Sequence, residues 1–293
     1  MELRILRYFV AVAREESITK AAESLHLSQP TLSRQLRDLE EELGKTLMLR
    51  GNKKTTLTEE GRLLYRRAQE IIDLAQKTES ELRQQEDLIG GDVWIGSAET
   101  DAMRLVASSV CSLQKEHPNI RVHLVSGNWV DIEERLEKGL VDFGLTIGDV
   151  DLKKYDSIGL PYTNSRGLLM RKDSPLASRD VITPDDLQGI PIISSRHEGM
   201  RGEFERWMGK KFDTLDVVAT YNLIYNAAFL VEENVGYALC IDRLVDTSND
   251  NLLCFIPLEP RMEVGINIAW KKHQIFSKAS QKFIEKFKEM MAH

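Results

Sequence analysis

The sequence has few cysteines and no long apolar run. Its three cysteines, Cys111, Cys240 and Cys254, are odd in number, lie far apart and form no CxxC pair, which argues against a disulfide framework or a zinc site. Cys111 stands among apolar residues, which indicates core packing. No apolar run reaches the roughly eighteen residues that a membrane-spanning helix needs. The first residues mix charged and apolar side chains and lack a signal-peptide core. We therefore expect a cytoplasmic protein with no membrane partner.

The sequence also lacks the usual signatures of enzymes. It contains no GxSxG elbow, P-loop, GxGxxG, HExxH or EF-hand pattern. Its 6 histidines show no spacing typical of metal ligands. We therefore expect no enzymatic activity, no metal and no cofactor. Two alternatives stay open, namely a thiol redox sensor using Cys240 and Cys254 and a solute-binding protein for transport.

Length and charge indicate more than one domain. A chain of 293 residues exceeds one ordinary core and predicts two or three domains. The net charge of −7 excludes a protein coated in basic residues. Residues 1–67, however, carry 13 basic and 10 acidic side chains, a net of +3, so that the rest carries −10. A mildly basic N-terminal domain followed by an acidic body is compatible with DNA binding by the first domain.

Residues 18–43 predict two short helices joined by a tight turn. In the second helix, which Ser28 is suited to cap, four leucines recur at spacings of 4, 3 and 4 and form one narrow apolar stripe. These leucines are Leu32, Leu36, Leu39 and Leu43. The opposite side carries Pro30, Arg34, Arg37 and Glu41, with Ser33 on the flank. This is the pattern of a helix-turn-helix whose second helix enters the DNA major groove, and the alternative is a helical hairpin with a solvated face.

The flanking segments predict a winged form of this motif. A first helix at residues 3–14 would pack across the helix pair, and residues 47–50 and 55–57 predict two short strands joined by a Gly-Asn turn. Arg50, Lys53 and Lys54 lie at or near the tip of this hairpin. We expect them to contact DNA phosphates, although a charged tip alone is equally typical of a solvated loop.

A long helix should begin after Thr58 and run to about residue 85. Its cap is only an imperfect capping box, because Gly61 stands where a glutamate or glutamine would reach back. Apolar and small residues then recur with heptad spacing. Because a helix this long cannot bury such a stripe in its own small domain, we expect it to pair with the same helix of a second subunit. The seam includes Leu64, Ala68, Ile71, Ala75 and Leu82. The alternative is packing of this face against the chain's own C-terminal body.

The first ~65 residues resemble the DNA-binding domain of the LysR-type transcriptional regulators. The resemblance rests on the segment LRYFVAVAREESITKAAESLHLSQPTLSRQLRDLEEELG, a short LxxR segment and LTEEG. Met48 departs from the family, which usually has Phe there, and puts only local wing packing in doubt. The resemblance implies a DNA-facing set of Gln29, Pro30, Thr31, Ser33, Arg34 and Arg37, to which we add Ser28. Arginine suits guanine O6 and N7, and glutamine suits adenine or a phosphate.

Beyond residue 90 the pattern changes to alternating strands and helices. Strands are expected at 93–96, 120–125, 141–147, 167–171, 191–194, 217–220, 237–241, 252–256 and 264–270, and helices at 100–116, 129–138, 184–188, 199–207, 223–233 and 277–290. Alternation of this kind predicts an α/β fold with a parallel sheet covered on both faces. The resemblance implies a periplasmic-binding-protein-like effector domain of two lobes. The predicted domains are therefore 1–58, a linker helix 59–89, and 90–293 with lobes at about 91–161 plus 267–293 and about 162–266.

Ligands of such sheets bind beyond the carboxyl ends of the strands, near helix N-termini. Polar residues at these junctions form the predicted effector site: Ser97, Glu99, Thr100, Asn128, Ser194, Ser195, Arg196, Tyr221 and Asn222. The resemblance implies a small effector, often a carboxylate, which the hydroxyls, amides and Arg196 would suit. Glu99 departs from the usual small or hydroxyl residue and indicates a positively charged or hydroxylated group on the ligand. The alternative is that these residues only cap helices.

The resemblance also implies a mechanism. A dimer, pairing into a tetramer through its regulatory lobes, would bind neighbouring sites on double-stranded, dyad-symmetric promoter DNA. An effector bound between the lobes would change their orientation and the spacing of the DNA-binding domains. We expect this to alter DNA bending and the approach of RNA polymerase, with the effector's differential affinity as the energy source.

Overall fold

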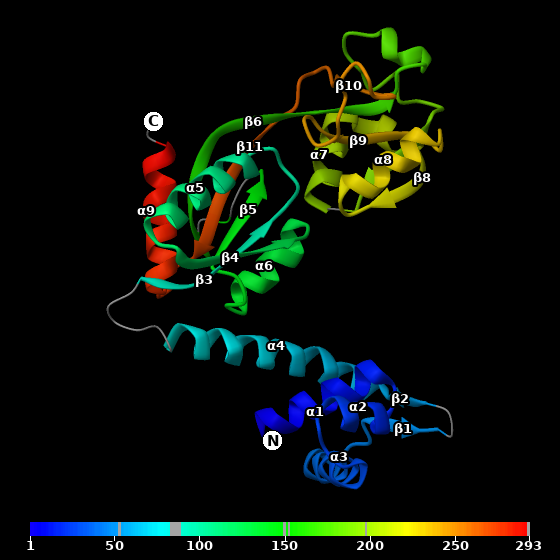
Figure 1. Cartoon of the computed structure of the whole chain (residues 1–293). Helices are drawn as coiled ribbons and strands as arrows, with labels where there is room; N and C mark the ends of the chain where they lie inside the picture. Colours follow the sequence, from blue (N-terminus) through cyan, green and yellow to red (C-terminus); the bar gives the residue numbers. More distant parts are fainter. Residues whose placement is uncertain (52–53, 83–88, 149–150, 152, 197, 292–293) are drawn as a thin grey trace. The chain divides into compact units, whose positions relative to one another are not determined.

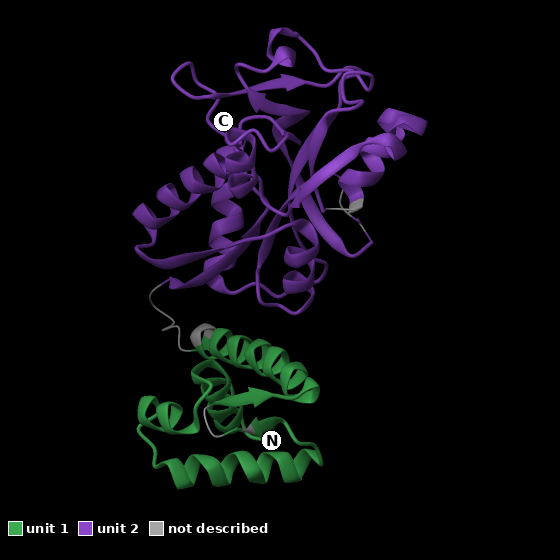
Figure 2. Cartoon of the chain, turned by 90° about the vertical axis from the view of Figure 1, so that its right-hand side faces the viewer, with its two compact units in different colours: residues 1–83 green, residues 84–293 purple. Residues whose placement is uncertain are grey.

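The structure is a computed structural model that describes residues 1–51, 54–82, 89–148, 151, 153–196 and 198–291. The chain forms two compact units, Met1–Arg83 and Gln84–His293, which Figure 2 shows in different colours. Unit 1 is mainly helical, and unit 2 is built on a mixed sheet flanked by helices (Figure 1).

Unit 1 is a winged helix-turn-helix followed by a long helix. Its elements are α1 (Leu3–Glu15), α2 (Ile18–Ser24), α3 (Gln29–Leu43), β1 (Met48–Arg50), β2 (Thr55–Leu57) and α4 (Glu59–Leu82). The hydroxyl oxygen of Ser28 accepts a hydrogen bond from the amide of Thr31 at 3.3 Å, and Ser17 caps α2 in the same way. The predicted cap of the second motif helix is therefore confirmed. Gly44, in the left-handed region at φ 62°, ends α3.

The core of unit 1 forms where α1, α2 and α3 meet the first half of α4. Leu32, Leu36 and Leu39 are buried in it, as the leucine stripe predicts, together with Phe9 of α1. Leu43 was expected in the same stripe but is 39% exposed. It is the last residue of α3, and the chain leaves the helix at the next position, so no neighbouring helix covers it.

Unit 2 contains strands β3 to β11 and helices α5 to α9. The strands are β3 (Gly90–Ser97), β4 (Asn119–Ser126), β5 (Phe143–Ile147), β6 (Tyr155–Arg171), β7 (Pro191–Ser195), β8 (Asp216–Tyr221), β9 (Tyr237–Ile241), β10 (Leu253–Pro257) and β11 (Glu263–Lys271). The helices are α5 (Met103–Glu116), α6 (Trp129–Glu137), α7 (Glu198–Met208), α8 (Ile224–Glu232) and α9 (Lys278–Met291). Short 3-10 turns, η1 (Pro175–Ser178) and η2 (Gly209–Thr214), complete the list.

The strands lie in the order β4-β3-β5-β11-β6-β9-β7-β8, and β10 pairs with β6. The first part of β6 pairs with β11 up to Ser165, and its remainder, from Arg166, pairs with β9 and β10. Strand β6 therefore belongs to two lobes. Lobe I contains β3, β4, β5, β11, the first part of β6, α5, α6 and α9. Lobe II contains the rest of β6, β7 to β10, α7 and α8.

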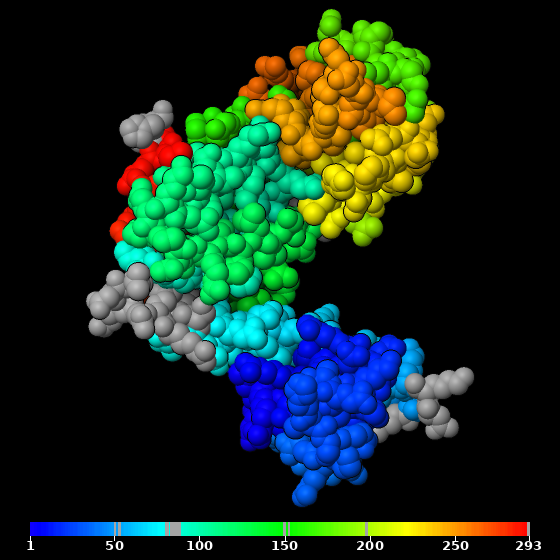
Figure 3. All heavy atoms as spheres, viewed as in Figure 1, coloured from blue at the N-terminus to red at the C-terminus, as the bar shows by residue number. Residues whose placement is uncertain are grey.

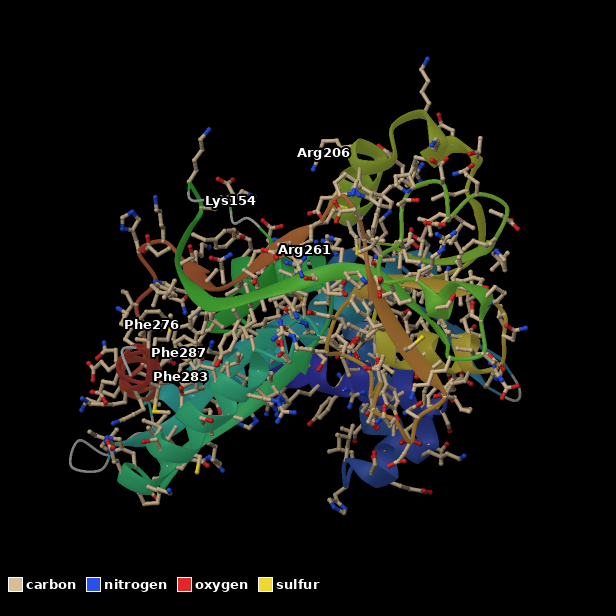
Figure 4. All side chains as sticks on the ribbon, turned by 90° about the horizontal axis from the view of Figure 1, so that it is seen from above. Lys154, Arg206, Arg261, Phe276, Phe283 and Phe287 are labelled. Carbon is tan, nitrogen blue, oxygen red and sulfur yellow. The ribbon has the colours of Figure 1, made fainter. Side chains whose placement is uncertain are left out.

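Helices cover both faces of each lobe. In lobe I, α5 and α9 share one core, in which Phe143 contacts Phe276 and Phe283 with ring centroids 5.0 and 5.1 Å apart. Figure 4 shows Phe276, Phe283 and Phe287 grouped at α9. The opposite face buries Ile132 of α6. In lobe II the cores beneath α7 and α8 likewise lie on opposite faces of the sheet.

Three expectations for unit 2 were wrong in detail. The sheet is mixed rather than parallel, because β6 and β11 run antiparallel to each other and to their neighbours. Residues 184–188 form turns instead of a helix, and the amides of Asp186 and Gln188 donate to carbonyl oxygens only three residues back. Cys111, expected in the core, is exposed because α5 buries the side that carries Leu113.

Candidate DNA-binding surface and effector cavity

The N-terminal end and outer side of α3 form an exposed polar surface. The buried leucines hold the helix against α1 and α2, so the other side of α3 is open to solvent. Exposed residues on it are Ser28, Gln29, Pro30, Thr31, Arg34 and Arg37. Their donors and acceptors suit base edges and phosphates, and the first turn of a helix offers free backbone N–H groups to an anion.

Ser33 does not belong to this surface. It was expected on the exposed flank but is 6% exposed, because its position on α3 lies between Leu32 and Leu36, which face the core. Its carbonyl oxygen instead accepts a hydrogen bond from Nε of Arg37 at 3.4 Å. Ser33 therefore supports the orientation of Arg37 and is removed from the DNA-facing set.

Lys54 of the wing hairpin forms an ion pair with an acidic residue of unit 1. Nζ of Lys54 lies 3.2 Å from Oε2 of Glu16, and both side chains are exposed. An exposed ion pair contributes about 1 kcal/mol or less, so Lys54 can exchange Glu16 for a phosphate at little cost. Arg50 is the last residue of β1. Lys53 lies outside the described residues.

The residues of the predicted dimer seam on helix α4 fall into two groups, one buried within unit 1 and one exposed. Ala68 is fully buried and Leu64 half-buried in the unit 1 core, against the expectation that this core is too small to cover them. The physical reason is that α1 packs along the first half of α4. Further along the helix, Ile71 and Leu82 are 40% and 81% exposed, and Ala75 between them is half-buried. Leu74, which the heptad pattern did not include, is 43% exposed beside them.

A cavity of about 100 Å³ lies between the two lobes of unit 2. Lobe I lines it with Ala98, Glu99, Asn128, Trp129 and Ile147. Lobe II lines it with Arg166, Ser195, Met200, Tyr221, Asn222, Leu223, Ile224, Cys240, Ile241 and Leu244. In Figure 3 the green spheres of lobe I meet the yellow and orange spheres of lobe II along one boundary. A concave, largely apolar space with a few polar groups is the usual form of a small-molecule site.

The polar groups around this cavity are hydrogen-bonded within the chain. Oε2 of Glu99 accepts a hydrogen bond from the amide of Ile224 at 2.6 Å, which joins the two lobes. Arg166 is 4% exposed, and its Nε and Nη2 both lie 2.6 Å from Oε2 of Glu203. Burial raises the pKa of Tyr221 well above its ordinary value, so the phenol stays protonated and donates to the carbonyl oxygen of Leu239 at 2.6 Å.

Two family models match the chain and together cover both units. Residues 3–62 match the family described as "Bacterial regulatory helix-turn-helix protein, lysR family", and residues 87–292 match "LysR substrate binding domain". The chain belongs to the LysR family. It is a DNA-binding transcriptional regulator with a C-terminal effector-binding domain, which confirms the resemblance seen in its first residues.

One curated relative of this LysR-type regulator spans its whole length, and another matches most of it. The Hca operon transcriptional activator HcaR of Escherichia coli (strain K12) is 30% identical over 298 residues, covering 100% of this chain and 99% of HcaR. The regulator BsdA of Bacillus subtilis (strain 168) is 30% identical over 216 residues, covering 72% of each protein. A crystal structure of full-length CbnR with its target DNA covers 99% of this chain and 100% of CbnR, with a TM-score of 0.75 and 19% identity. That likeness supports the predicted fold.

The structure brings five of the predicted effector residues of this LysR-type regulator together. Glu99, Asn128, Ser195, Tyr221 and Asn222 all line the interlobe cavity. Glu99 was expected to meet a positively charged or hydroxylated ligand group, but the amide of Ile224 occupies one of its carboxylate oxygens.

The other four predicted residues lie outside the cavity lining. Ser97 and Thr100 are buried, and their hydroxyls bind the carbonyl oxygen of Ala98 and the side chain of Asn164. Ser97 is the last residue of β3, and the hydroxyl of Thr100, in the turn after it, accepts a hydrogen bond from the amide of Ala102 at 3.2 Å. Ser194 and Arg196 line a separate open groove, where Nε of Arg196 donates to Thr220 at 3.0 Å.

Sequence reasoning missed several residues of the cavity, above all Arg166. Its only signal is a cation placed directly before the apolar run at 167–170 of β6. Trp129, Met200 and Leu244 were missed as well, because apolar residues near a cavity cannot be distinguished by pattern from core residues.

Cys240 in β9 and Cys254 in β10 are free cysteines, the first buried and the second half-buried. Burial raises the pKa of Cys240 to about 12 and also raises the pKa of Cys254. Thiols protonated in this way are poor nucleophiles, which weighs against the redox-sensor alternative. Among the residues that the structure describes, no group of three or more His, Cys, Asp or Glu side chains could hold a metal ion. No described helix is long and apolar enough to cross a membrane.

Proposed function

We propose that this LysR-type regulator works as a symmetric oligomer whose affinity for promoter DNA is set by a small molecule in the interlobe cavity. The observation that carries the proposal is the cavity itself. It lies between two lobes that share strand β6, in a chain that also carries a helix-turn-helix. A ligand in this position contacts both lobes and therefore affects their relative orientation.

The exposed residues of α3 are proposed to enter the major groove. Arg34 and Gln29 supply the donors suited to base edges, and Arg37 and Lys54 supply charge for phosphates. The crystal structure of full-length CbnR in complex with its target DNA supports DNA as the partner.

DNA binding is tested with a DNase footprint and an electrophoretic shift on the DNA upstream of the regulator's own gene. Arg34→Ala should abolish the protected region. Arg135→Ala removes the same charge from an exposed position on α6 and should leave it unchanged. A random-site selection that returns no preferred sequence for the wild type would refute the DNA-binding part of the proposal.

Dimerisation is proposed through the second half of α4. Ile71, Leu74 and Leu82 are exposed apolar side chains on a helix whose first half is already packed, and a second copy would bury them. Ile71→Glu combined with Leu82→Glu should yield monomers in sedimentation at micromolar concentration. Asp73→Lys, about 200° around the helix from Ile71, is the matched control and should not change the mass.

A tetramer is proposed through two apolar surfaces of unit 2. One is the open groove between α5 and β4, lined by Val110, Val122 and Leu124 among others. The other is formed by α8, where Tyr225 and Phe229 are 67% and 49% exposed with their rings 5.4 Å apart. Phe229→Asp should reduce a tetramer to a dimer without affecting the dimer itself.

Control of transcription is proposed to operate through contact with RNA polymerase on the same DNA. A change in the spacing of the DNA-binding units alters the bend of the DNA between their sites, and a bend changes what a neighbouring polymerase can reach. In vitro transcription from the footprinted promoter, with and without the effector, tests this step. Equal transcript levels at saturating regulator would contradict it.

A further inference from the structure

We propose that the effector of this regulator is a small uncharged molecule, mainly apolar, and that Glu99 excludes carboxylates from the cavity. The inference rests on the proposed function, because it specifies the ligand of the same cavity. It reverses the expectation of a carboxylate effector that came from the family resemblance.

The first step concerns the N-terminus of α8. The first backbone N–H groups of a helix lack intrahelical partners and lie at the positive end of its dipole, so they attract carboxylates. Leu223, the N-cap residue of α8, provides no side-chain cap. Instead, the carboxylate of Glu99, from lobe I, accepts the hydrogen bond of the Ile224 amide at 2.6 Å. The chain's own carboxylate thus occupies the position that a ligand carboxylate would take.

Other polar groups at the cavity are also bound within the chain. Oδ1 of Asn222 accepts from the amide of Leu223 at 2.9 Å, and Oδ1 of Asn128 accepts from the amide of Asp131 at 3.1 Å, which caps α6. The guanidinium of Arg166 is bound to Glu203. A carboxylate entering the cavity would therefore have to displace Glu203 from Nε and Nη2 of Arg166, or Glu99 from the Ile224 amide.

The negative charge of Glu99 adds to the free-energy cost of binding a carboxylate in the cavity. A second carboxylate beside Glu99 would place two like charges in a partly desolvated space, where repulsion is much stronger than in water. An uncharged ligand avoids this repulsion and gains from contact with Trp129, Ile147, Leu223 and Leu244. An apolar cavity of about 150 Å³ is known to hold benzene, so the space here suits a molecule of about that size or slightly smaller.

The test compares two probes of equal shape and different charge, isobutyramide and isobutyrate, by ligand-observed NMR titration of the full-length chain. The wild type should bind the amide at least tenfold more tightly than the carboxylate. Glu99→Ser frees the Ile224 amide, and its affinity for isobutyrate should rise at least tenfold over the wild type. Glu205→Gln removes the same charge from an exposed residue of α7 outside the cavity and should match the wild type for both probes.

The Glu99→Gln variant controls for the possibility that Glu99→Ser acts by changing how the two lobes pack. It retains an oxygen that can accept from the Ile224 amide and removes only the charge, so the ratio of carboxylate to amide affinity should still rise. The proposal is overturned if the wild type binds isobutyrate as tightly as isobutyramide, or if neither Glu99 variant gains affinity for isobutyrate. Binding of neither probe to any variant would refute the cavity as an effector site, and with it that part of the proposed function. Equal binding of both probes refutes the present inference alone.

Discussion

Replacing Gly61 by alanine should destabilise unit 1, although alanine normally favours a helix. Gly61 lies in the first turn of α4, where an added Cβ would lie 2.0 Å from the carbonyl oxygen of Leu47. That oxygen cannot move freely, because it accepts the amide of Thr58 at 3.0 Å. The Thr58 hydroxyl in turn donates to the carbonyl oxygen of Thr46 at 2.8 Å and caps the Gly61 amide at 2.9 Å. Alanine must therefore push the start of α4 away from the wing.

The expected size follows from three opposing contributions to the free energy of unfolding. Helix propensity favours alanine over glycine by about 1 kcal/mol. Overpacking against a fixed backbone atom costs about 1–3 kcal/mol. Weakening two of the Thr58 hydrogen bonds, from its amide to Leu47 and from the Gly61 amide to its hydroxyl, costs about 1 kcal/mol each. The net loss of stability for unit 1 should be about 2–4 kcal/mol, a large part of the total for a small domain.

Gly202→Ala is the matched control. Gly202 lies inside α7, and the nearest atom to an added Cβ is the end of the flexible Arg206 side chain at 3.7 Å. Only helix propensity then applies, and unit 2 should gain up to about 1 kcal/mol. The same substitution in two helices is thus expected to act with opposite signs.

The assay can follow the units separately, because all 4 tryptophans lie in unit 2. In urea, Gly61→Ala should lower the unfolding midpoint of unit 1, followed by far-ultraviolet circular dichroism. The midpoint followed by tryptophan fluorescence, which reports on unit 2, should stay unchanged. Gly202→Ala should raise the fluorescence midpoint. A unit 1 midpoint for Gly61→Ala equal to or above that of the wild type would show that propensity outweighs the contact, and the reasoning would be wrong.

Three further predictions concern other parts of the chain. Ser17→Ala and Ser28→Ala each remove an N-cap and should each lower the stability of unit 1 by about 1 kcal/mol in urea, but only Ser28→Ala should also weaken DNA binding in a shift assay. Hydrogen bonds from the hydroxyl and amide of Thr183 hold the pKa of Asp186 below its ordinary value, so this carboxylate stabilises unit 2 above its unfolded pKa and that stability is lost as the pH falls through the folded pKa. Asp186→Asn should therefore reduce the fall of the urea midpoint, followed by fluorescence, as the pH is lowered. Asp180→Asn, at an exposed position, should reproduce the wild-type pH dependence. Because burial raises the pKa of Cys240 to about 12, Ellman's reagent should react rapidly with the exposed Cys111 and not with Cys240, and Cys111→Ser should abolish the fast phase.

Unit 1 could be predicted closely from the sequence because its determinants are local. The leucine spacing of α3, the Ser28 cap and the Gly44 end signal lie within one short segment. The exception, Ala68, depends on how α1 packs against α4, more than fifty residues away along the chain. Heptad spacing alone cannot state which partner covers such a residue, because the same apolar stripe serves a neighbour in the chain or a second copy equally well.

The effector cavity could be predicted only in outline. Its general place followed from the expected ends of the strands, and Glu99 and Tyr221 were found in this way. Its chemistry depends on contacts that join distant segments, such as Glu99 with Ile224 across 125 positions and Arg166 with Glu203 across 37. No spacing in the sequence predicts such pairs, and they decide which donors are left for a ligand.

The same contacts bear on how an effector would control the regulator. The lobes share strand β6, and Glu99 adds a hydrogen bond between them beside the cavity, so that bond is part of the energy that distinguishes one lobe orientation from another. A ligand that binds both orientations equally shifts neither, however tightly it binds. A ligand that strengthens or breaks the contact between Glu99 and Ile224 does discriminate, and about 1.4 kcal/mol of such discrimination changes the ratio of the two states tenfold. Loss of the charge in Glu99→Gln should therefore change the DNA affinity of the ligand-free regulator as well as its ligand preference, whereas a residue that only lines the cavity should change the ligand preference alone.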